Sequence, residues 1–173
     1  MRVLALDLAK QTGWACGEPC AQPISGTIHL DSDHEDVRYL QLFRRIAELI
    51  VEHGVTSVVF EASWMRSGKG RQDNIRTLQP LYGYRAIAMA ACAYRGIHPV
   101  PVDASAWRRH FLGSAGGKRD ELKRLAKDMC LARGWTPSNA DEAESLGLLD
   151  YRLTVIEPRH LVYGMRRGGF SQG

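Results

Sequence analysis

Apolar residues along the chain follow two patterns, short runs and helical repeats. Runs typical of strands cover residues 2–8, 14–17, 24–30, 55–61 and 97–103. Stretches with the composition and spacing of helices cover residues 31–52, 74–95, 104–111, 118–132 and 139–153. Three strands in an antiparallel meander, followed by alternating helices and strands, predict an α/β fold. Its mixed five-stranded sheet has three antiparallel strands, then two parallel ones, and is flanked by helices.

Polar residues and glycines mark the ends of these elements. Gln11-Thr12-Gly13 predicts a turn between the first two strands, and Asp31-Ser32-Asp33 offers caps for the first helix. We find no repeat and no low-complexity tract in the 173 residues. The whole chain, residues 1–173, is therefore expected to form one domain, with the tail from about residue 154 unassigned.

Acidic residues close two of the strands and open the last helix. Asp7 ends the first run and Glu61 ends the fourth, and in the expected sheet these strands are adjacent and parallel. Asp141 and Glu144 are three residues apart, which places them on one face of the last helix. Converging carboxylates repel each other unless cations neutralise them, so the sequence predicts a divalent metal site.

Each acidic residue also has a structural interpretation when taken alone. The strand-end aspartate can form a turn, and the strand-end glutamate can pair with an arginine. Ser138 or Asn139 can cap the last helix, with Asp141 or Glu142 completing a capping box. Four carboxylates at two strand ends and one helix start favour the metal site over separate caps. Two Mg²⁺ ions about 4 Å apart, held by such ligands, would serve phosphodiester hydrolysis.

The charge balance permits nucleic-acid binding. Lys and Arg number 23 against 19 Asp and Glu, a net charge of +4. The basic residues that we predict to contact DNA phosphates are Arg66, Lys69, Arg71, Arg76, Arg108, Arg109, Lys118, Arg119 and Lys123. Trp64 and Met65 can wedge between bases or anchor their loop to the core, and Trp107 is expected in the core. Lys118, at a helix start where a cation opposes the dipole, either faces a phosphate or is a solvated lysine.

The remaining composition excludes several classes. Four cysteines give no disulfide framework, and Cys16-x3-Cys20 lacks a second close pair to complete a zinc site. No apolar run approaches the length of a membrane span, and the N-terminus lacks the layout of a secretory signal. We expect reduced thiols, no membrane partner and a cytoplasmic location.

Three segments in order along the chain form a specific set of motifs. They are Leu4-Ala5-Leu6-Asp7-Leu8-Ala9-x-x-Thr12-Gly13-Trp14-Ala15, Val59-Phe60-Glu61-Ala62 and Asp141-Glu142-Ala143-Glu144-Ser145-Leu146-Gly147-Leu148. Val102-Asp103-x-x-x-Trp107-Arg108 and the helix after Lys118 fit the same order. Over about residues 2–153, the sequence resembles RuvC-like Holliday junction resolvases of the short phage and prophage branch, which have the RNase H-like fold.

The resemblance implies a nuclease of DNA recombination and repair that cuts four-way junctions with Mg²⁺ or Mn²⁺, two ions per active site. Asp7, Glu61, Asp141 and Glu144 would be the acidic tetrad. Lys118 would be the basic residue near the scissile phosphate. The family's fourth acid is usually aspartate, and Glu144 adds a methylene group.

The resemblance also implies a homodimer that cuts both strands symmetrically. Its subunits would pair through the helix at residues 74–95, its junction-opening loop would begin at Trp64, and it would act in a bacterial cell or as a phage protein in one. Two alternatives share the same motifs, a nuclease for RNA–DNA hybrids or other branched DNA and a noncatalytic junction-binding protein. A sugar-kinase or actin-like ATPase would need two related domains, for which the chain is too short.

Overall fold

The computed structural model describes residues 1–62 and 75–156. Among the predicted DNA-binding residues, Arg76 is described by its backbone alone, and five lie outside the described ranges: Trp64, Met65, Arg66, Lys69 and Arg71. The strands are β1 (Val3–Asp7), β2 (Gln11–Gly17), β3 (Ile24–His29), β4 (Ser57–Ala62) and β5 (Val100–Asp103). The helices are α1 (Glu35–Glu52), α2 (Ile75–Tyr94), α3 (Ala104–Leu112), α4 (Arg119–Ala132) and α5 (Ala140–Tyr151), the last continued by a π-helical turn over Arg152–Ile156.

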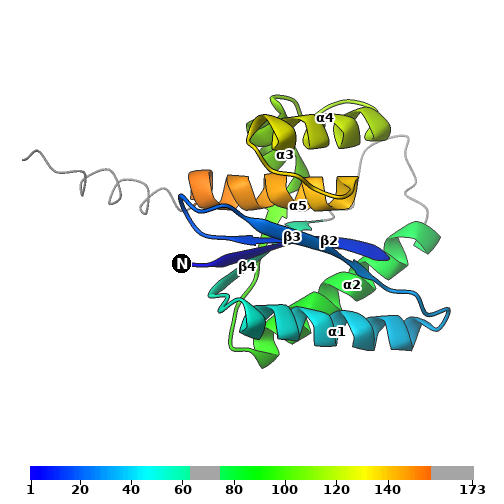
Figure 1. Ribbon diagram of the computed structural model, residues 1–173. Helices are drawn as coiled ribbons and strands as arrows, with labels where there is room; N and C mark the ends of the chain where they lie inside the picture. The colour runs from blue at the N-terminus through cyan, green and yellow to red at the C-terminus, as the bar shows by residue number, and fades with distance from the viewer. Residues whose placement is uncertain (63–74, 157–173) are drawn as a thin grey trace, which may run out of the picture.

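The five strands form one mixed sheet in the order β3-β2-β1-β4-β5. β1 pairs antiparallel with β2 and parallel with β4, and β5 continues the parallel half. Helices α1 and α2 cover one face of the sheet, and α3, α4 and α5 cover the other (Figure 1). This arrangement confirms the predicted fold class, and it brings the carboxyl ends of β1 and β4 to the same edge of the sheet.

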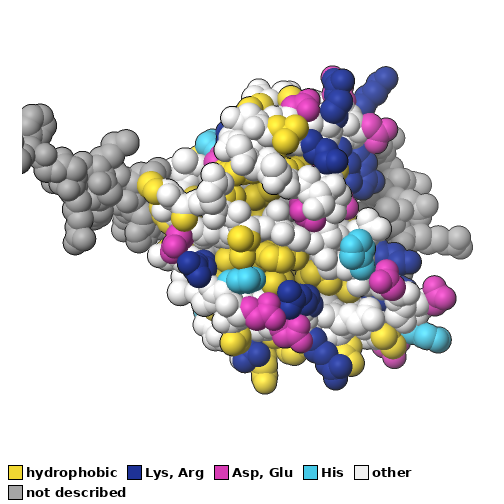
Figure 2. All heavy atoms as spheres, in the orientation of Figure 1, with side chains coloured by type: hydrophobic (Ala, Val, Ile, Leu, Met, Phe, Trp, Pro, Cys, Tyr) yellow, Lys and Arg dark blue, Asp and Glu magenta, His cyan; other side chains and the backbone are white. Residues whose placement is uncertain are grey.

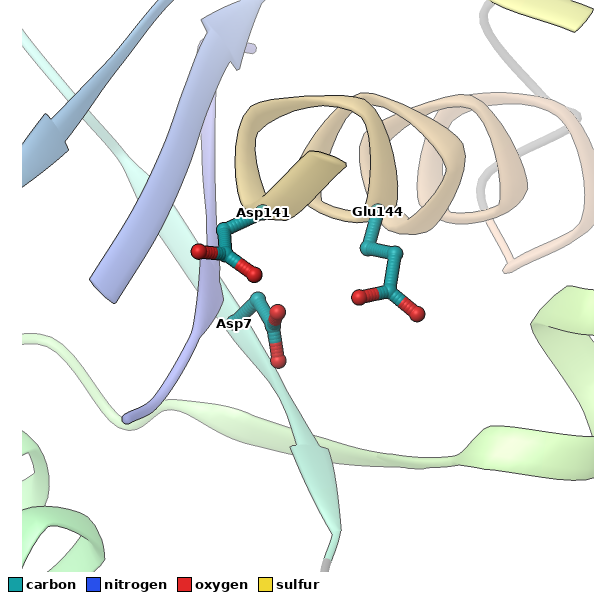
Figure 3. A group of neighbouring side chains, drawn as sticks. All are labelled: Asp7, Asp141 and Glu144. Carbon is teal, nitrogen blue, oxygen red and sulfur yellow. The ribbon is translucent and has the colours of Figure 1, made fainter. Parts of the chain in front are cut away.

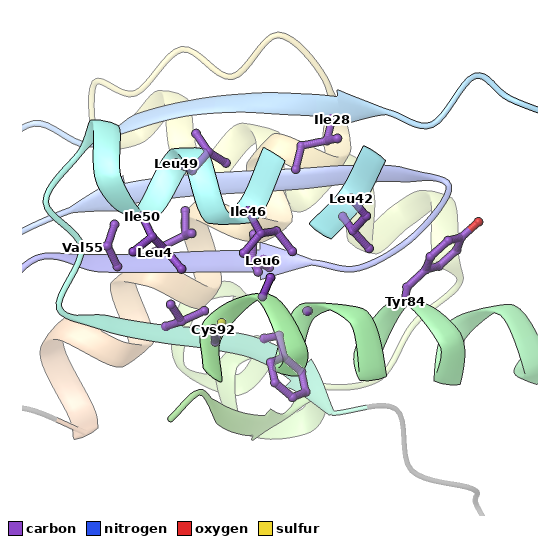
Figure 4. Close-up of a cluster of buried hydrophobic side chains, with 14 of the residues drawn as sticks. Leu4, Leu6, Ile28, Leu42, Ile46, Leu49, Ile50, Val55, Tyr84 and Cys92 are labelled. Atoms are coloured by element: carbon purple, nitrogen blue, oxygen red, sulfur yellow. The ribbon is translucent and has the colours of Figure 1, made fainter. Parts of the chain in front are cut away.

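Alternation along β1 explains why its apolar run is continuous. Leu4 and Leu6 pack toward α1 and α2, in the cluster shown in Figure 4. Val3 and Ala5 point to the opposite face, into the core beneath α5. All four side chains are fully buried, because a central strand covered by helices on both faces has no polar side.

Two local predictions are wrong. Gln11-Thr12-Gly13 belongs to β2 rather than to a turn, which lies at residues 8–10. The Thr12 hydroxyl donates to the carbonyl oxygen of Ala9 at 2.7 Å and accepts from its N–H at 3.2 Å, so this side chain closes the turn from within the strand. Helix α1 begins with His34 at the N-cap and no side-chain cap, while the Ser32 hydroxyl accepts from the His34 N–H instead.

Within the described ranges, no helix has both the length and the apolar character that crossing a bilayer requires.

Candidate active site

Asp7 ends β1 directly after its buried run and lies opposite Gly13 of β2 in the sheet register. Burial raises the pKa of Asp7 well above the usual aspartate value. Neighbouring carboxylates raise it further, in the order Glu144, Glu61 and Asp141, against a smaller lowering by Lys123. The carboxyl at the strand end is therefore surrounded by negative charge that a cation would stabilise.

The start of α5 is a capping box. The Asn139 side chain accepts from the Glu142 N–H at 2.9 Å, and the Glu142 carboxylate accepts from the Ser138 N–H at 3.1 Å. Glu142 is 5% exposed and also accepts from the Thr27 hydroxyl at 3.0 Å, which ties the helix to β3. The capping interpretation is thus confirmed for Asn139 and Glu142, and Asp141 is left to face the end of β1.

Asp7, Asp141 and Glu144 converge. One carboxylate oxygen of each lies within 4.8 Å of the other two. Figure 3 shows Asp141 and Glu144 extending from successive turns of α5 toward Asp7. The longer Glu144 side chain therefore reaches the cluster. These three residues line a cavity of about 400 Å³ together with Glu61, Arg108 and Arg119.

Gly13 lets the helix come this close to the sheet. A Cβ atom at this position would lie 2.0 Å from the carbonyl oxygen of Asp141 and 2.3 Å from its carbonyl carbon. Both are backbone atoms, so only a residue without a side chain allows the first turn of α5 to rest on β2. Gly13 therefore allows α5 to approach β2 closely enough for Asp141 to lie near Asp7.

Glu61 faces the same cavity from β4 but is held by groups of α3. Its carboxylate accepts from the Trp107 indole N–H at 2.9 Å and from the Arg108 guanidinium at 3.2 Å. Trp107 is 1% exposed, as expected for a core residue. The structure therefore pairs Glu61 with an arginine, which was one of its two sequence interpretations, and places it beside the other three carboxylates.

Lys123 is the lysine of α4 that contacts the cluster. Its Nζ lies 2.6 Å from Asp141 Oδ1 and 3.9 Å from Glu144 Oε2. Lys118 is exposed at the N-cap of the same helix, without a side-chain cap. The role predicted for Lys118 near a phosphate stays a prediction, and Lys123 is a site residue whose contact with the acids the sequence did not reveal.

The pKa of Glu144 is also raised, first by burial. Lys123 and Arg108 act in the lowering direction, whereas Glu61 and Asp141 raise it. The raised pKa values of Asp7 and Glu144 mean that burial disfavours the ionised form of both carboxyls, which a bound cation would stabilise. Clustered carboxylate oxygens are the hard ligands that Mg²⁺ and Mn²⁺ prefer, so the donor set fits a divalent cation.

Two basic side chains, Arg108 and Arg119, line the cavity. Arg119 is exposed and lines it, and Figure 2 shows Lys and Arg gathered over α4. Arg109 points away from the acidic cluster, with its guanidinium donating to the Ser105 carbonyl and hydroxyl at 3.1 Å. Positively charged side chains beside an acidic centre are suited to binding a polyanionic substrate.

Comparison of whole sequences identifies no relative, since neither a protein-family model nor a curated protein matches. Comparison of structures finds chains with a similar fold. The Thermus thermophilus RuvC structure matches with a TM-score of 0.63 and 13% identity, over 89% of this chain and 96% of that chain. The structure of T. thermophilus RuvC in complex with a Holliday junction substrate gives 0.62 and 11%, over 85% and 89%. The yeast mitochondrial Holliday junction resolvase Ydc2 gives 0.60 and 10%, over 94% and 83%.

The chain has the RuvC fold. This is the RNase H-like arrangement that the motifs predicted, and it extends over nearly the whole of the bacterial RuvC chain. Within this fold, the cluster of this chain contains Glu144 with Asp7 and Asp141, and Arg108 and Lys123 contact it. A fold shared at this identity does not carry an activity with it, so the function has to be argued from the site.

Proposed function

We propose that this protein is a structure-selective DNA endonuclease that resolves four-way Holliday junctions by divalent-metal-dependent phosphodiester hydrolysis. The observation that carries the proposal is the convergence of Asp7, Asp141 and Glu144 in one cavity of a RuvC fold. Two of the similar structures support the choice of substrate, since one is RuvC with a Holliday junction substrate and another is a Holliday junction resolvase.

Four side chains would hold the metal, two ions of Mg²⁺ or Mn²⁺ per site. Asp7, Asp141 and Glu144 present their oxygens to a common space, and Glu61 lies at its edge as the fourth acid. A bound divalent cation supplies a nucleophile at neutral pH and neutralises charge that develops on the phosphate. The protein's part is to hold the ligands in place, which it does by resting α5 on Gly13.

The basic rim would position the DNA. Arg109, Lys118 and Arg119 are exposed on α3 and α4, on the side of the sheet that carries α5. Such residues contact phosphates and set the register of the DNA, while the geometry of the junction supplies the selectivity. The basic loop from Trp64 would complete this surface and open the junction.

Symmetric cutting requires two sites, and α2 offers the surface for a second copy. Its inner face is buried through Ala88, Ala91 and Cys92, yet its outer face is also apolar. Tyr82 is 38% and Met89 is 45% exposed there. A helix that is apolar on both faces is suited to a buried position, which pairing of two α2 helices would provide.

The test is cleavage of labelled substrates of matched sequence. A synthetic four-way junction, a linear duplex and an RNA–DNA hybrid are incubated with the protein in Mg²⁺, in Mn²⁺ and in chelator. We expect paired, symmetric nicks in the junction alone, lost with chelator and in Asp7→Asn. Asp7→Asn should keep its affinity for the junction, because phosphate contacts come from the basic residues.

Other outcomes would replace the proposal. Cleavage of the hybrid in preference to the junction would make the protein an RNase H-like nuclease of different substrate. Tight junction binding without any metal-dependent cleavage would make it a noncatalytic junction binder. A folded Asp7→Asn protein that no longer binds the junction would contradict the separation of metal ligands from DNA contacts.

A further inference from the structure

Two cationic side chains occupy the acidic cluster in the structure. Lys123 Nζ lies 2.6 Å from Asp141 Oδ1 and 3.9 Å from Glu144 Oε2. Arg108 Nη2 lies 3.2 Å from Glu61 Oε2 and 3.8 Å from Glu144 Oε1. The two cations come from different helices, α4 and α3, and meet at Glu144. Together they contact three of the four carboxylates that would hold a metal ion, namely Glu61, Asp141 and Glu144.

Asp7 differs from the other three acids of the cluster because it has no basic side chain paired with it within the described residues. No ion pair within the described residues involves it, although it is the acid at the end of the central strand. The cluster therefore consists of three acids that carry a side-chain counter-cation and one that does not.

Arg108 makes only part of its possible hydrogen bonds in this position. Its Nη2 donates to both oxygens of Glu61, at 3.2 and 3.4 Å, while its Nε is buried without a hydrogen-bond partner. Its guanidinium carbon lies 5.3 Å from the centre of the Trp107 ring. A buried donor without an acceptor costs free energy, so this placement is held by charge attraction against a polar cost.

We propose that Arg108 and Lys123 are internal counter-cations that hold the metal-free site closed and that divalent ions must displace. The inference rests on the metal site of the proposed function. Two cationic side chains and divalent ions at the same carboxylates repel each other and compete for the same negative charge, so each weakens the binding of the other. The two side chains thereby set the metal concentration at which the site fills, and filling it releases both of them toward the DNA side of the cavity.

This competition predicts that removing either charge tightens metal binding. In isothermal titration with Mn²⁺ and with Mg²⁺, without DNA, we expect Lys123→Gln and Arg108→Gln to lower the metal dissociation constant by on the order of tenfold. A lysine or arginine that simply supported the site would give the opposite result, because its loss would disorder the carboxylates and weaken binding.

The chain provides matched controls for both variants. Lys127 lies one turn after Lys123 on α4, and Arg109 follows Arg108 on α3 but bonds to Ser105. Lys127→Gln and Arg109→Gln remove the same charge from the same helices without touching the carboxylates. Their metal dissociation constants should stay within about twofold of the unmodified protein, because the charges they remove are more distant and solvent-screened.

A second readout needs no variant. Without metal, the contact with Asp141 at 2.6 Å shields the Lys123 amine from reagents, so acetic anhydride should label it slowly. Saturating Mn²⁺ should speed its labelling relative to Lys127, as followed by peptide mass spectrometry. Because this labelling uses the unmodified protein, it tests the displacement of the counter-cations even if Arg108→Gln does not fold.

The outcomes separate this inference from the proposed function. Unchanged or weaker metal binding by a folded Lys123→Gln protein, or Lys123 labelling that ignores saturating Mn²⁺, would overturn the counter-cation role and leave the nuclease proposal intact. Absence of any metal binding by the unmodified protein at millimolar concentration would instead overturn the metal site, and the proposed function with it.

Discussion

Glu142 and Glu144 lie two positions apart in α5 and have opposite surroundings. Glu142 is buried and accepts hydrogen bonds from the Ser138 N–H and from the side chains of Thr27, Ser25 and Asn139. Glu144 faces other carboxylates, and its pKa is raised by burial. The first glutamate stabilises the fold through these hydrogen bonds, whereas burial disfavours the ionised form of the second, which belongs to the site.

This contrast predicts different effects of the same substitution. Glu142→Ala should lower the free energy of unfolding by about 2–3 kcal/mol, because it leaves several buried donors without an acceptor. Glu144→Ala should change it by less than about 1 kcal/mol, since the lost packing and ion-pair contacts are offset by removal of the cost of burying its carboxylate. Urea denaturation of both variants in chelator makes the comparison. Equal losses would show that Glu144 is also a structural residue.

The raised pKa of Asp7 predicts how stability depends on pH. A carboxyl whose pKa is higher in the folded state favours folding while it is protonated, and this contribution is lost as pH rises through the folded-state pKa. In chelator, the unmodified protein should therefore lose stability relative to Asp7→Asn as pH rises above the usual aspartate range, about 4. Thermal melts of the two proteins at several pH values measure this difference. Saturating Mg²⁺ at neutral pH should reverse it, and a difference independent of pH would contradict the raised pKa.

Sequence reasoning found the acids but not their partners. Asp7, Asp141 and Glu144 could be predicted because each follows from a local pattern, a strand end or a helix face. The inward position of Lys123 depends on the rotation of α4 against α5, which only tertiary packing fixes. One local pattern bears on it, since the buried Leu122, Ala126 and Cys130 mark the inner face and Lys123 borders it.

The contact between β2 and α5 is the decisive one at the scale of elements. Gly13→Ala would place a methyl group 2.0 Å from a backbone atom of Asp141. We expect it to lower the free energy of unfolding by about 1–3 kcal/mol, as other overpacking substitutions do, and to weaken metal binding by moving Asp141 away from Asp7. Gly116→Ala is the control, because a Cβ there has nothing within 4 Å.

Calorimetric titration of both glycine variants with Mn²⁺, alongside urea denaturation, tests this prediction. A Gly13→Ala protein with the metal affinity of the Gly116→Ala control would mean that α5 can shift without disturbing the site.

Helices and strands could be predicted from the sequence wherever the spacing of apolar residues marks where they begin and end. The strand and helix order needed only the alternation of runs, and it gave the correct sheet. The turn at residues 8–10 was misplaced because Thr12 and Gly13, typical turn residues, serve here as a turn-closing hydroxyl and as a contact with α5. The cap of α1 was misplaced because the Ser32 hydroxyl bonds before the helix begins.

At the scale of the whole molecule, the prediction concerns the second copy. Met89→Asp on the outer face of α2 should raise the dimer dissociation constant by about 100-fold or more, because it would bury an unpaired carboxylate. Leu131→Asp is the control, since Leu131 is equally apolar and 60% exposed but lies on α4, across the sheet. Sedimentation velocity over a range of concentrations measures the effect. Equal behaviour of both variants would exclude pairing through α2.

The fold of the whole chain could be predicted from the sequence because three motifs in order constrain one sheet, even though whole-sequence comparison finds no match. Pairing of subunits was not accessible in the same way. Exposed apolar residues such as Tyr82 and Met89 become visible only once the inner face of α2 is known.

The most direct test of the whole account is cleavage of a supercoiled plasmid that extrudes a cruciform, with Mg²⁺ and a matched plasmid lacking the inverted repeat. Paired cuts across the cruciform within one complex give linear DNA, whereas single cuts give nicked circles. We predict linear product from the cruciform plasmid only, none with chelator and none with Asp7→Asn. Equal cutting of both plasmids, or cutting that persists in Asp7→Asn, would contradict a junction nuclease built on this acidic site.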